Sequence, residues 1–123
     1  MNTSLKHLSA FQRDILYVVA DLDTPYGLAI KRGLEEYYDE DVNTGRVYQN
    51  LNRLVDMEYI EKSEIDKRTN PYTLTQKSVI AMKNRHHWQL THVERRIQIE
   101  ALQVDSLLRQ LHGFYWFDTV VIS

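Results

Sequence analysis

The segment between Thr75 and Gly113 constrains the fold most, because it includes neither glycine nor proline and its apolar side chains recur at helical spacing. A helix from Thr75 to about His112 would extend about 55 Å, which is longer than a small domain. Its apolar residues form a heptad-like seam with one extra residue: Leu90, Val93, Ile97, Ala101, Val104, Leu108 and Leu111. Such a seam needs a second chain to cover it, so we expect a homodimer.

Residues 1–75 predict three short helices followed by a β-hairpin. Ser9 and Gln12 match a capping box at the start of the first helix, and Asn43 or Thr44 can cap the third. The expected elements are helices over 9–22, 28–38 and 45–57 and strands over 59–65 and 71–74. This order is typical of a winged helix-turn-helix. We therefore expect a mainly helical α+β fold, with a winged-helix domain over 1–75 and a dimerisation helix with an apolar tail over 76–123.

The composition excludes several classes of protein. The 123 residues contain no cysteine, which rules out disulfides, thiolate metal sites and a cysteine nucleophile. The four glycines form no phosphate-binding loop, and no nucleophile elbow or catalytic carboxylate pair is recognisable. No apolar run reaches the about 20 residues of a membrane helix, and the N-terminus lacks a signal-peptide pattern. We therefore expect a cytoplasmic protein that is not an enzyme and carries no cofactor.

The charge is unevenly distributed along the chain. The formal net charge is −2, and residues 1–42 contain eight acidic and four basic side chains. Much of this acidity lies in residues 35–41. A solvated charge run is the simplest interpretation of that segment, and binding of cations or of a partner is the alternative. An acidic balance is unusual for a nucleic-acid-binding protein, but binding depends on the local surface rather than on the sum.

The third predicted helix has one apolar and one polar side. Its apolar side carries Val47, Leu51, Leu54 and Val55. The polar side could read base edges in the major groove, since arginine pairs with guanine and glutamine or asparagine with adenine. The candidate base-reading residues are Arg46, Gln49, Asn50 and Arg53. Candidates for contacts to the DNA backbone are Asn43, Thr44, Gly45 and Tyr48 on the helix and Lys67 and Arg68 in the hairpin turn. A merely solvated polar face is the alternative.

Three short motifs resemble the PadR-like family of regulators. They are Tyr-Gly-Leu-Ala-Ile over 26–30, Gly-Arg-Val-Tyr-Gln-Asn-Leu-Asn-Arg-Leu over 45–54, and Tyr-Thr-Leu-Thr over 72–75. The resemblance implies a homodimeric transcription regulator whose winged helices bind double-stranded DNA and whose C-terminal helix joins the protomers. A dimer of this kind is expected to bind an inverted repeat. Glu58 and Ser78 stand where the family usually has glycine, so the ends of the third helix and of the wing can be built differently.

The chain also resembles a haloarchaeal member of this family whose name denotes a response to reactive oxygen species. That resemblance implies a regulator of a stress response in a halophilic archaeon. Because the chain has no cysteine, an oxidant signal would have to reach it through a ligand, the salt concentration, protein abundance or another protein. The competing interpretation is a winged-helix adaptor that binds protein within a transcription complex, using residues 35–41 and the apolar tail.

The remaining candidate sites are weaker. His86, His87 and His92 do not have the i, i+4 spacing that places two ligands on one helix face, so no metal site is expected. Trp88 and the aromatic residues 115–117 favour packing over a ligand cavity. The sequence thus indicates DNA and a second copy of the chain as partners and excludes a membrane, while a small-molecule ligand is possible but has no support.

Overall fold

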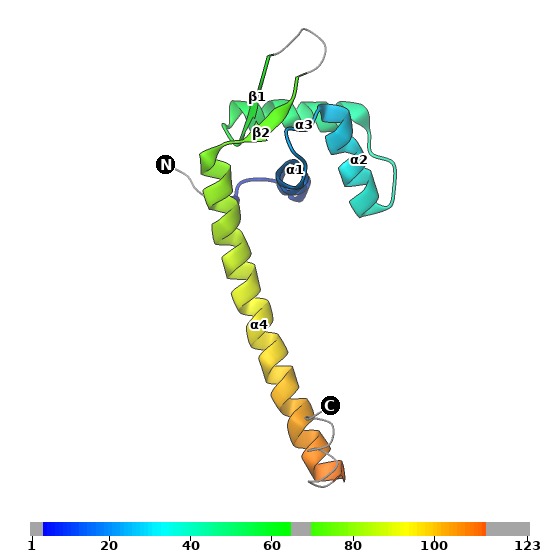
Figure 1. Ribbon diagram of the computed structural model, residues 1–123, viewed down its shortest axis with the longest axis vertical. Helices are drawn as coiled ribbons and strands as arrows, with labels where there is room; N and C mark the ends of the chain where they lie inside the picture. The colour runs from blue at the N-terminus through cyan, green and yellow to red at the C-terminus, as the bar shows by residue number, and fades with distance from the viewer. Residues whose placement is uncertain (1–3, 65–69, 113–123) are drawn as a thin grey trace. The chain divides into compact units, whose positions relative to one another are not determined.

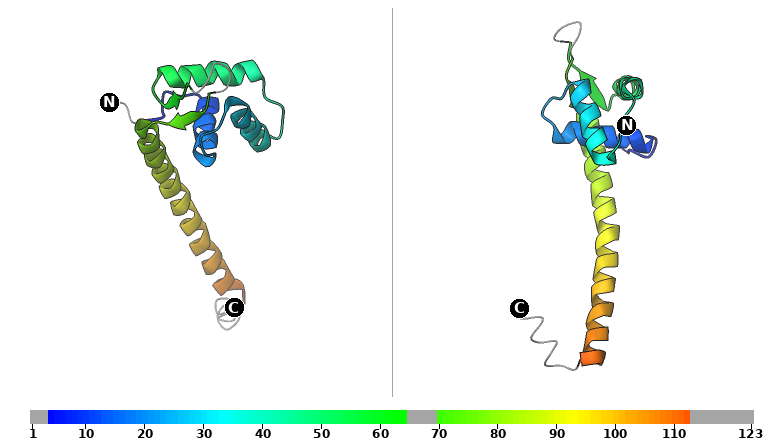
Figure 2. Two further views of the ribbon diagram at one scale, coloured as in Figure 1. Left: turned by 45° about the horizontal axis from the view of Figure 1, so that its top comes forward. Right: turned by 90° about the vertical axis from the view of Figure 1, so that its right-hand side faces the viewer.

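The computed structural model describes residues 4–64 and 70–112, which divide into two compact units between Arg85 and His86. The elements are α1 (Ala10–Asp21), α2 (Gly27–Tyr38), α3 (Thr44–Asp56), β1 (Ile60–Lys62), β2 (Tyr72–Leu74) and α4 (Gln76–His112) (Figure 1). Within the first unit, α3 lies along one face, with α1 and α2 beneath it (Figure 2). Three helices, an antiparallel hairpin and a long helix confirm the predicted winged helix-turn-helix class.

The start of α1 is fixed by the predicted capping box. The backbone N–H of Gln12 donates to Ser9 Oγ at 3.1 Å, and the backbone N–H of Ser9 donates to Gln12 Oε1 at 3.0 Å. These two bonds satisfy backbone donors that have no partner inside the helix, and an N-cap of this kind stabilises by about 1 kcal/mol. The local sequence signal therefore predicted the beginning of α1 correctly.

The core of the first unit lies among the three short helices and the hairpin. Its fully buried apolar residues come from every helix of the bundle: Ile15, Leu16, Ile30, Leu34, Val47, Leu51 and Leu54. The predicted apolar stripe of α3 is thus confirmed, with Val55 packed at its margin. The backbones of α1 and α2 approach closely at Gly33, where an added Cβ would lie 2.6 Å from a methyl carbon of Val18.

The turn between α2 and α3 is held by a carboxylate. Asp39 ends α2 in the left-handed conformation, with φ 56°. Beyond it, the backbone N–H of Val42 donates to Glu35 Oε2 at 3.0 Å, and Lys31 forms an ion pair with the same oxygen at 3.5 Å. The hydrogen bond from Val42 lowers the pKa of the Glu35 carboxyl, with a smaller contribution from Lys31. One member of the acidic segment 35–41 therefore has a structural role.

The hairpin is shorter than predicted. Its register pairs Ile60 with Leu74, Glu61 with Thr73 and Lys62 with Tyr72. Residue 59 does not belong to the strand, because the backbone N–H of Tyr59 donates to the Leu54 carbonyl and completes the end of α3. The second strand begins at Tyr72 rather than Pro71, since proline has no N–H to donate. The predicted strand end at residue 65 lies outside the described residues.

The long helix α4 begins inside the first unit. Thr75 Oγ1 accepts the backbone N–H of Ser78 at 3.2 Å and so caps the first turn of the helix. Ser78, Ala81 and Met82 are buried in the first unit. The helix is described as far as His112, and Gly113 and the apolar tail lie outside the described residues. Within the described ranges, no helix combines the length and the apolar character that a membrane crossing requires.

Candidate nucleic-acid interface

The first turn of α3 is capped and open to solvent. The side-chain Oδ1 of Asn43 accepts the backbone N–H of Arg46 at 2.8 Å, which identifies Asn43 rather than Thr44 as the N-cap. Thr44 and Gly45 are exposed, and an added Cβ at Gly45 would meet only the Asn43 side chain, at 3.1 Å. The N-terminus of a helix attracts anions through its free N–H groups and its dipole. A phosphate could therefore approach this end of α3 closely.

The face of α3 opposite the core is polar and accessible. Arg46, Gln49 and Arg53 are all exposed, whereas the apolar stripe on the other side is buried. The three side chains follow one another at about one-turn intervals, so they present two guanidinium groups and one carboxamide along a single line. Donors and acceptors of these types match the base edges of the major groove.

Arg46 is not simply extended into solvent. Its guanidinium carbon lies 3.8 Å from the centroid of the Phe11 ring on α1, within the range of a cation–π contact. The Phe11 ring in turn stacks with Tyr38 of α2, with centroids 6.3 Å apart. Arg46 therefore rests on an aromatic platform supplied by the other two helices, which sequence reasoning along α3 did not anticipate.

Asn50 does not fit the base-reading role predicted for it. It is 8% exposed, and both ends of its carboxamide are bonded within the protein. Nδ2 donates to the Arg46 carbonyl at 2.8 Å, and Oδ1 accepts from Gln12 Nε2 at 3.1 Å. The prediction erred because Asn50 lies at the edge of the polar face, where α1 covers it. Asn50 instead ties the first turns of α3 to the start of α1.

Tyr48 packs against the start of α2. An added Cβ at Gly27 would lie 2.5 Å from the Tyr48 hydroxyl oxygen and 2.6 Å from two carbons of its ring. The ring thus covers the backbone of Gly27, and Tyr48 remains 36% exposed. Burial, and to a smaller extent the nearby Tyr48, raise the pKa of Tyr72. The glycine in the Tyr26–Ile30 motif and the tyrosine in the α3 motif are therefore structural partners.

The C-terminal end of α3 is held by the first turn of α4. Glu58 adopts φ 65°, the left-handed conformation that glycine adopts without strain. Thr75 Oγ1 donates to the Glu58 carbonyl at 2.8 Å, and Ser78 Oγ donates to the Tyr59 carbonyl at 2.7 Å. Lys77 Nζ donates to the Met57 carbonyl at 2.8 Å. The two departures from the family pattern thus lie close together: Glu58 is in the turn after α3, and Ser78 in α4 bonds to the carbonyl of the next residue, Tyr59.

The predicted seam on α4 is exposed in the second unit. Leu90, Val93, Ile97, Val104 and Leu111 are between 44% and 65% exposed, Ala101 is also exposed and Leu108 is half-buried. Four further apolar residues that the seam did not include are exposed as well: Trp88, Ile99, Leu102 and Leu107. Ile99 and Leu102 lie on the side of the helix away from the seam. An apolar surface of this extent is unusual for a chain that acts alone.

The remaining predicted residues are the histidines of α4, the basic residues of the hairpin turn and the C-terminal aromatic residues. Among the described residues, no three histidine, aspartate or glutamate side chains are grouped as metal ligands. His92 contacts Trp88 one turn earlier, with ring centroids 4.5 Å apart and His92 Nδ1 2.7 Å from the Trp88 carbonyl oxygen. Lys67 and Arg68 of the hairpin turn, and the aromatic residues 115–117, lie outside the described residues.

The match to a family model decides the affiliation of this chain. The model of the PadR-like transcriptional regulator family matches residues 15–92. The chain belongs to the PadR-like family. That placement confirms the resemblance of the three motifs and groups the chain with DNA-binding transcriptional regulators. No match was found among curated protein sequences.

The solved structures of similar fold include RosR, which is 44% identical to this chain, and more distant proteins such as FabT. RosR from H. salinarum, in a complex named RosR-S4, is 44% identical over 85% of this PadR-like chain and 94% of that chain, with a TM-score of 0.69. A second structure of RosR, from crystals grown from NaBr, matches over 97% of the RosR chain, with a TM-score of 0.70. FabT from Streptococcus pneumoniae, in complex with DNA, is 23% identical over 94% of this chain and 79% of that chain, with a TM-score of 0.62, and shares the fold.

Proposed function

We propose that this PadR-like protein is a homodimeric transcription regulator that reads a specific sequence in double-stranded DNA. The observation that carries the proposal is the polar face of α3, where Arg46, Gln49 and Arg53 are exposed opposite a buried apolar stripe. A solvated helix needs no such alignment of base-pairing side chains. The complex of FabT with DNA, in a protein of the same fold, supports the assignment.

Each residue of the interface has a distinct role in this proposal. Arg46, Gln49 and Arg53 read base edges, and each good bidentate pair would contribute about 1–3 kcal/mol of discrimination against a wrong base. Contacts to the sugar-phosphate backbone come from the other candidates: Asn43, Thr44, Gly45, Tyr48, Lys67 and Arg68. Asn50 acts indirectly, because its hydrogen bond to the Arg46 carbonyl helps to position the first turn of α3.

The homodimer is supported by the exposed apolar side chains of α4. Covering Leu90, Val93, Ile97 and the rest of the seam with the same helix of a second protomer would remove them from water. Two winged-helix units related by a two-fold axis would then read an inverted repeat, with half-sites about one helical turn, or ~10 bp, apart.

We also propose that the protein acts in the cytoplasm of a halophilic archaeon, in a response to reactive oxygen species. The 44% identity with RosR from H. salinarum supports this setting. In molar salt, counterion release from DNA contributes little to affinity. Direct contacts from the polar face of α3 would then carry a larger share of the binding free energy, and the acidic residues 35–41 would disfavour non-specific DNA.

Selection of duplexes from a random pool tests this function directly. The purified protein would be offered the pool in dilute and in molar potassium chloride, and the bound duplexes sequenced. We expect enrichment of an inverted repeat that persists in molar salt. Absence of enrichment at both salt concentrations would overturn the proposal and favour a winged-helix adaptor that binds protein.

A further inference from the structure

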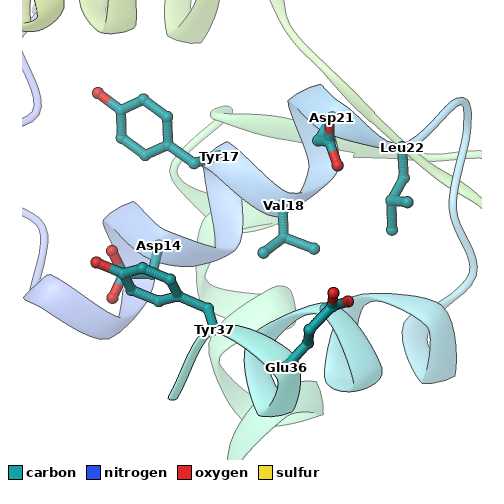
Figure 3. A pocket seen from close by; sticks show the side chains of 8 residues that line it. Asp14, Tyr17, Val18, Asp21, Leu22, Glu36 and Tyr37 are labelled. Carbon is teal, nitrogen blue, oxygen red and sulfur yellow. The ribbon is translucent and has the colours of Figure 1, made fainter. Parts of the chain in front are cut away.

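A groove of about 760 Å³ lies between α1 and α2, outside the polar face of α3 (Figure 3). Val18 and Leu22 supply its apolar lining, and Gly33 allows α2 to approach Val18 closely. A volume of this size is within the range of small-molecule sites in proteins. None of its lining residues belongs to α3 or to the hairpin, so the groove is separate from the proposed DNA interface.

Every charged side chain that lines the groove is acidic. Asp14 and Asp21 come from α1 and Glu36 from α2. In the close view, Asp21 and Glu36 are directed into the groove from its two helices (Figure 3). Among residues 4–64 and 70–112, neither of these two carboxylates has a hydrogen bond or an ion pair, since Lys31 pairs with Glu35 instead. The charged lining of the groove is therefore entirely acidic, and these two carboxylates are unpaired within the described part of the chain.

Two tyrosines complete the lining. Tyr37 is 75% exposed, and Tyr17 lies at the edge of the groove with its ring partly in water. The faces of aromatic rings attract cations, most strongly those with weakly hydrated, apolar substituents. Carboxylates, tyrosine rings and an apolar floor together match one kind of ligand. We propose that this groove binds an organic ammonium ion whose apolar body lies on Val18 and Leu22, and that its occupation weakens DNA binding.

The route from the groove to α3 is a short chain of contacts. Asp14 lines the groove, and Tyr38 Oη donates to Asp14 Oδ2 at 2.5 Å. Tyr38 stacks on Phe11, and Phe11 carries the guanidinium of Arg46. A cation beside Asp14 competes with Tyr38 for the carboxylate. The stacked rings of Phe11 and Tyr38 beneath Arg46 then lose the hydrogen bond that holds Tyr38 in place. This step rests on the proposed role of Arg46 in reading DNA, whereas ligand binding itself does not.

Calorimetry on the DNA-free protein tests the groove, with benzyltrimethylammonium chloride as the probe. Tetramethylammonium supplies the charge without the apolar body, and benzyl alcohol supplies the ring without the charge. We expect the probe to bind about tenfold more tightly than either control compound. Asp21→Asn and Glu36→Gln should each lower the affinity for the probe, and together they should lower it about tenfold. Glu40→Gln removes an exposed acid outside the groove and should leave binding unchanged.

Three results would overturn the binding proposal. They are absence of probe binding, equal affinity for the three compounds, and equal affinity of the wild-type protein and the Asp21→Asn/Glu36→Gln variant. Sedimentation of the same variants supplies a further test. A change in their oligomeric state would show that the groove is an interface between copies of the chain rather than a ligand site.

The coupling is tested with the duplex selected by the protein. The probe should weaken binding of this duplex several-fold for the wild-type protein and not for Asp21→Asn/Glu36→Gln, which excludes an action of the probe on DNA. Tyr38→Phe keeps the ring but removes the bond to Asp14, so it should bind the probe without the change in DNA affinity. A wild-type protein that selects DNA and binds the probe without any response would overturn the coupling and leave the proposed function standing. Failure to select any duplex would overturn the proposed function, while calorimetry would still decide the groove.

Discussion

A side-chain carbon at Gly27 would lie 2.5 Å from the hydroxyl oxygen of Tyr48, so the tyrosine ring occupies the space that any other residue at position 27 needs. This relationship joins the first residue of α2 to the exposed side of α3. The atoms that conflict are the far end of a partly exposed side chain, which can swing away. The position of Tyr48, more than the stability of the fold, therefore depends on this glycine.

Gly27→Ala should displace the Tyr48 ring at little cost in stability. We expect the free energy of unfolding in urea to change by less than about 0.5 kcal/mol and the affinity for the selected duplex to fall. Gly33→Ala is the matched control, because its Cβ would meet the short side chain of Val18 in the α1–α2 contact. It should destabilise the fold by about 1 kcal/mol, since overpacking costs more than the gain in helix propensity. Equal effects of the two changes on unfolding would contradict this account.

Glu58→Gly should stabilise the protein. Glu58 has φ 65°, and a left-handed conformation costs a residue with a side chain about 1–2 kcal/mol that glycine does not incur. After the greater freedom of glycine in the unfolded chain is subtracted, a gain of about 1 kcal/mol remains. Urea unfolding measures it. Glu61→Gly, in β1, is the control and should destabilise, so a loss of stability in both variants would refute the assignment of strain to residue 58.

Ser78→Ala should loosen the contact between the first turn of α4 and the residues that follow α3. Ser78 is completely buried, and its Oγ donates to the Tyr59 carbonyl at 2.7 Å. The Tyr59 carbonyl still accepts the backbone N–H of Thr75 at 3.2 Å, so the change removes one buried hydrogen bond and should cost about 1 kcal/mol, again measured by urea unfolding. Gln76→Ala changes an exposed residue of the same turn and should remain within about 0.5 kcal/mol of the wild-type protein. An equally small effect at Ser78 would show that the bond contributes nothing.

Replacement of Asn50 should affect mainly stability, whereas replacement of Gln49 should affect mainly base preference. Asn50→Ala leaves the buried Gln12 Nε2 without its acceptor and removes a second donor from the Arg46 carbonyl, so unfolding should become easier by about 1–3 kcal/mol. Its base preference should stay that of the wild-type protein. Gln49→Ala should leave stability within about 0.5 kcal/mol and change base preference. The reverse pattern in a competition assay would restore Asn50 to the base-reading set.

Acid should weaken the turn between α2 and α3 through Glu35. The hydrogen bond from Val42 lowers the pKa of this carboxyl in the folded protein. A carboxyl with a lowered folded pKa contributes stability above its unfolded pKa and loses it as the pH falls through the folded value. Between about pH 7 and pH 3, Glu35→Gln should therefore show a smaller loss of stability than the wild-type protein. Glu40→Gln should follow the wild-type curve, and a Glu35→Gln curve parallel to it would contradict the assignment.

Local signals predicted the parts of the fold that depend on neighbouring residues. The capping box at Ser9, the N-cap near Asn43 and the apolar stripe of α3 are encoded within a few positions of each other, so periodicity and capping rules were sufficient. The hairpin was predicted too long, because Tyr59 is drawn into the end of α3 by a bond to Leu54 that strand propensity does not represent.

The candidate site was predicted only in outline for the same reason. The exposed side of α3 follows from its own sequence, but the burial of Asn50 depends on Gln12, 38 positions earlier. The contact of Arg46 with Phe11 likewise joins residues of different helices. Two sequence signals did mark other long-range contacts. Gly27 in the 26–30 motif lies against Tyr48, and Glu58, in place of a glycine, lies in the turn that Thr75 contacts.

Repeating the duplex selection with Gln49→Ala tests the central claim that α3 reads DNA through its polar face. The account predicts an inverted repeat for the wild-type protein, and for the variant the same repeat with degeneracy at one position in each half-site. Enrichment of an identical sequence by both proteins would contradict the claim, because it would show that the residue at the centre of this face does not read a base.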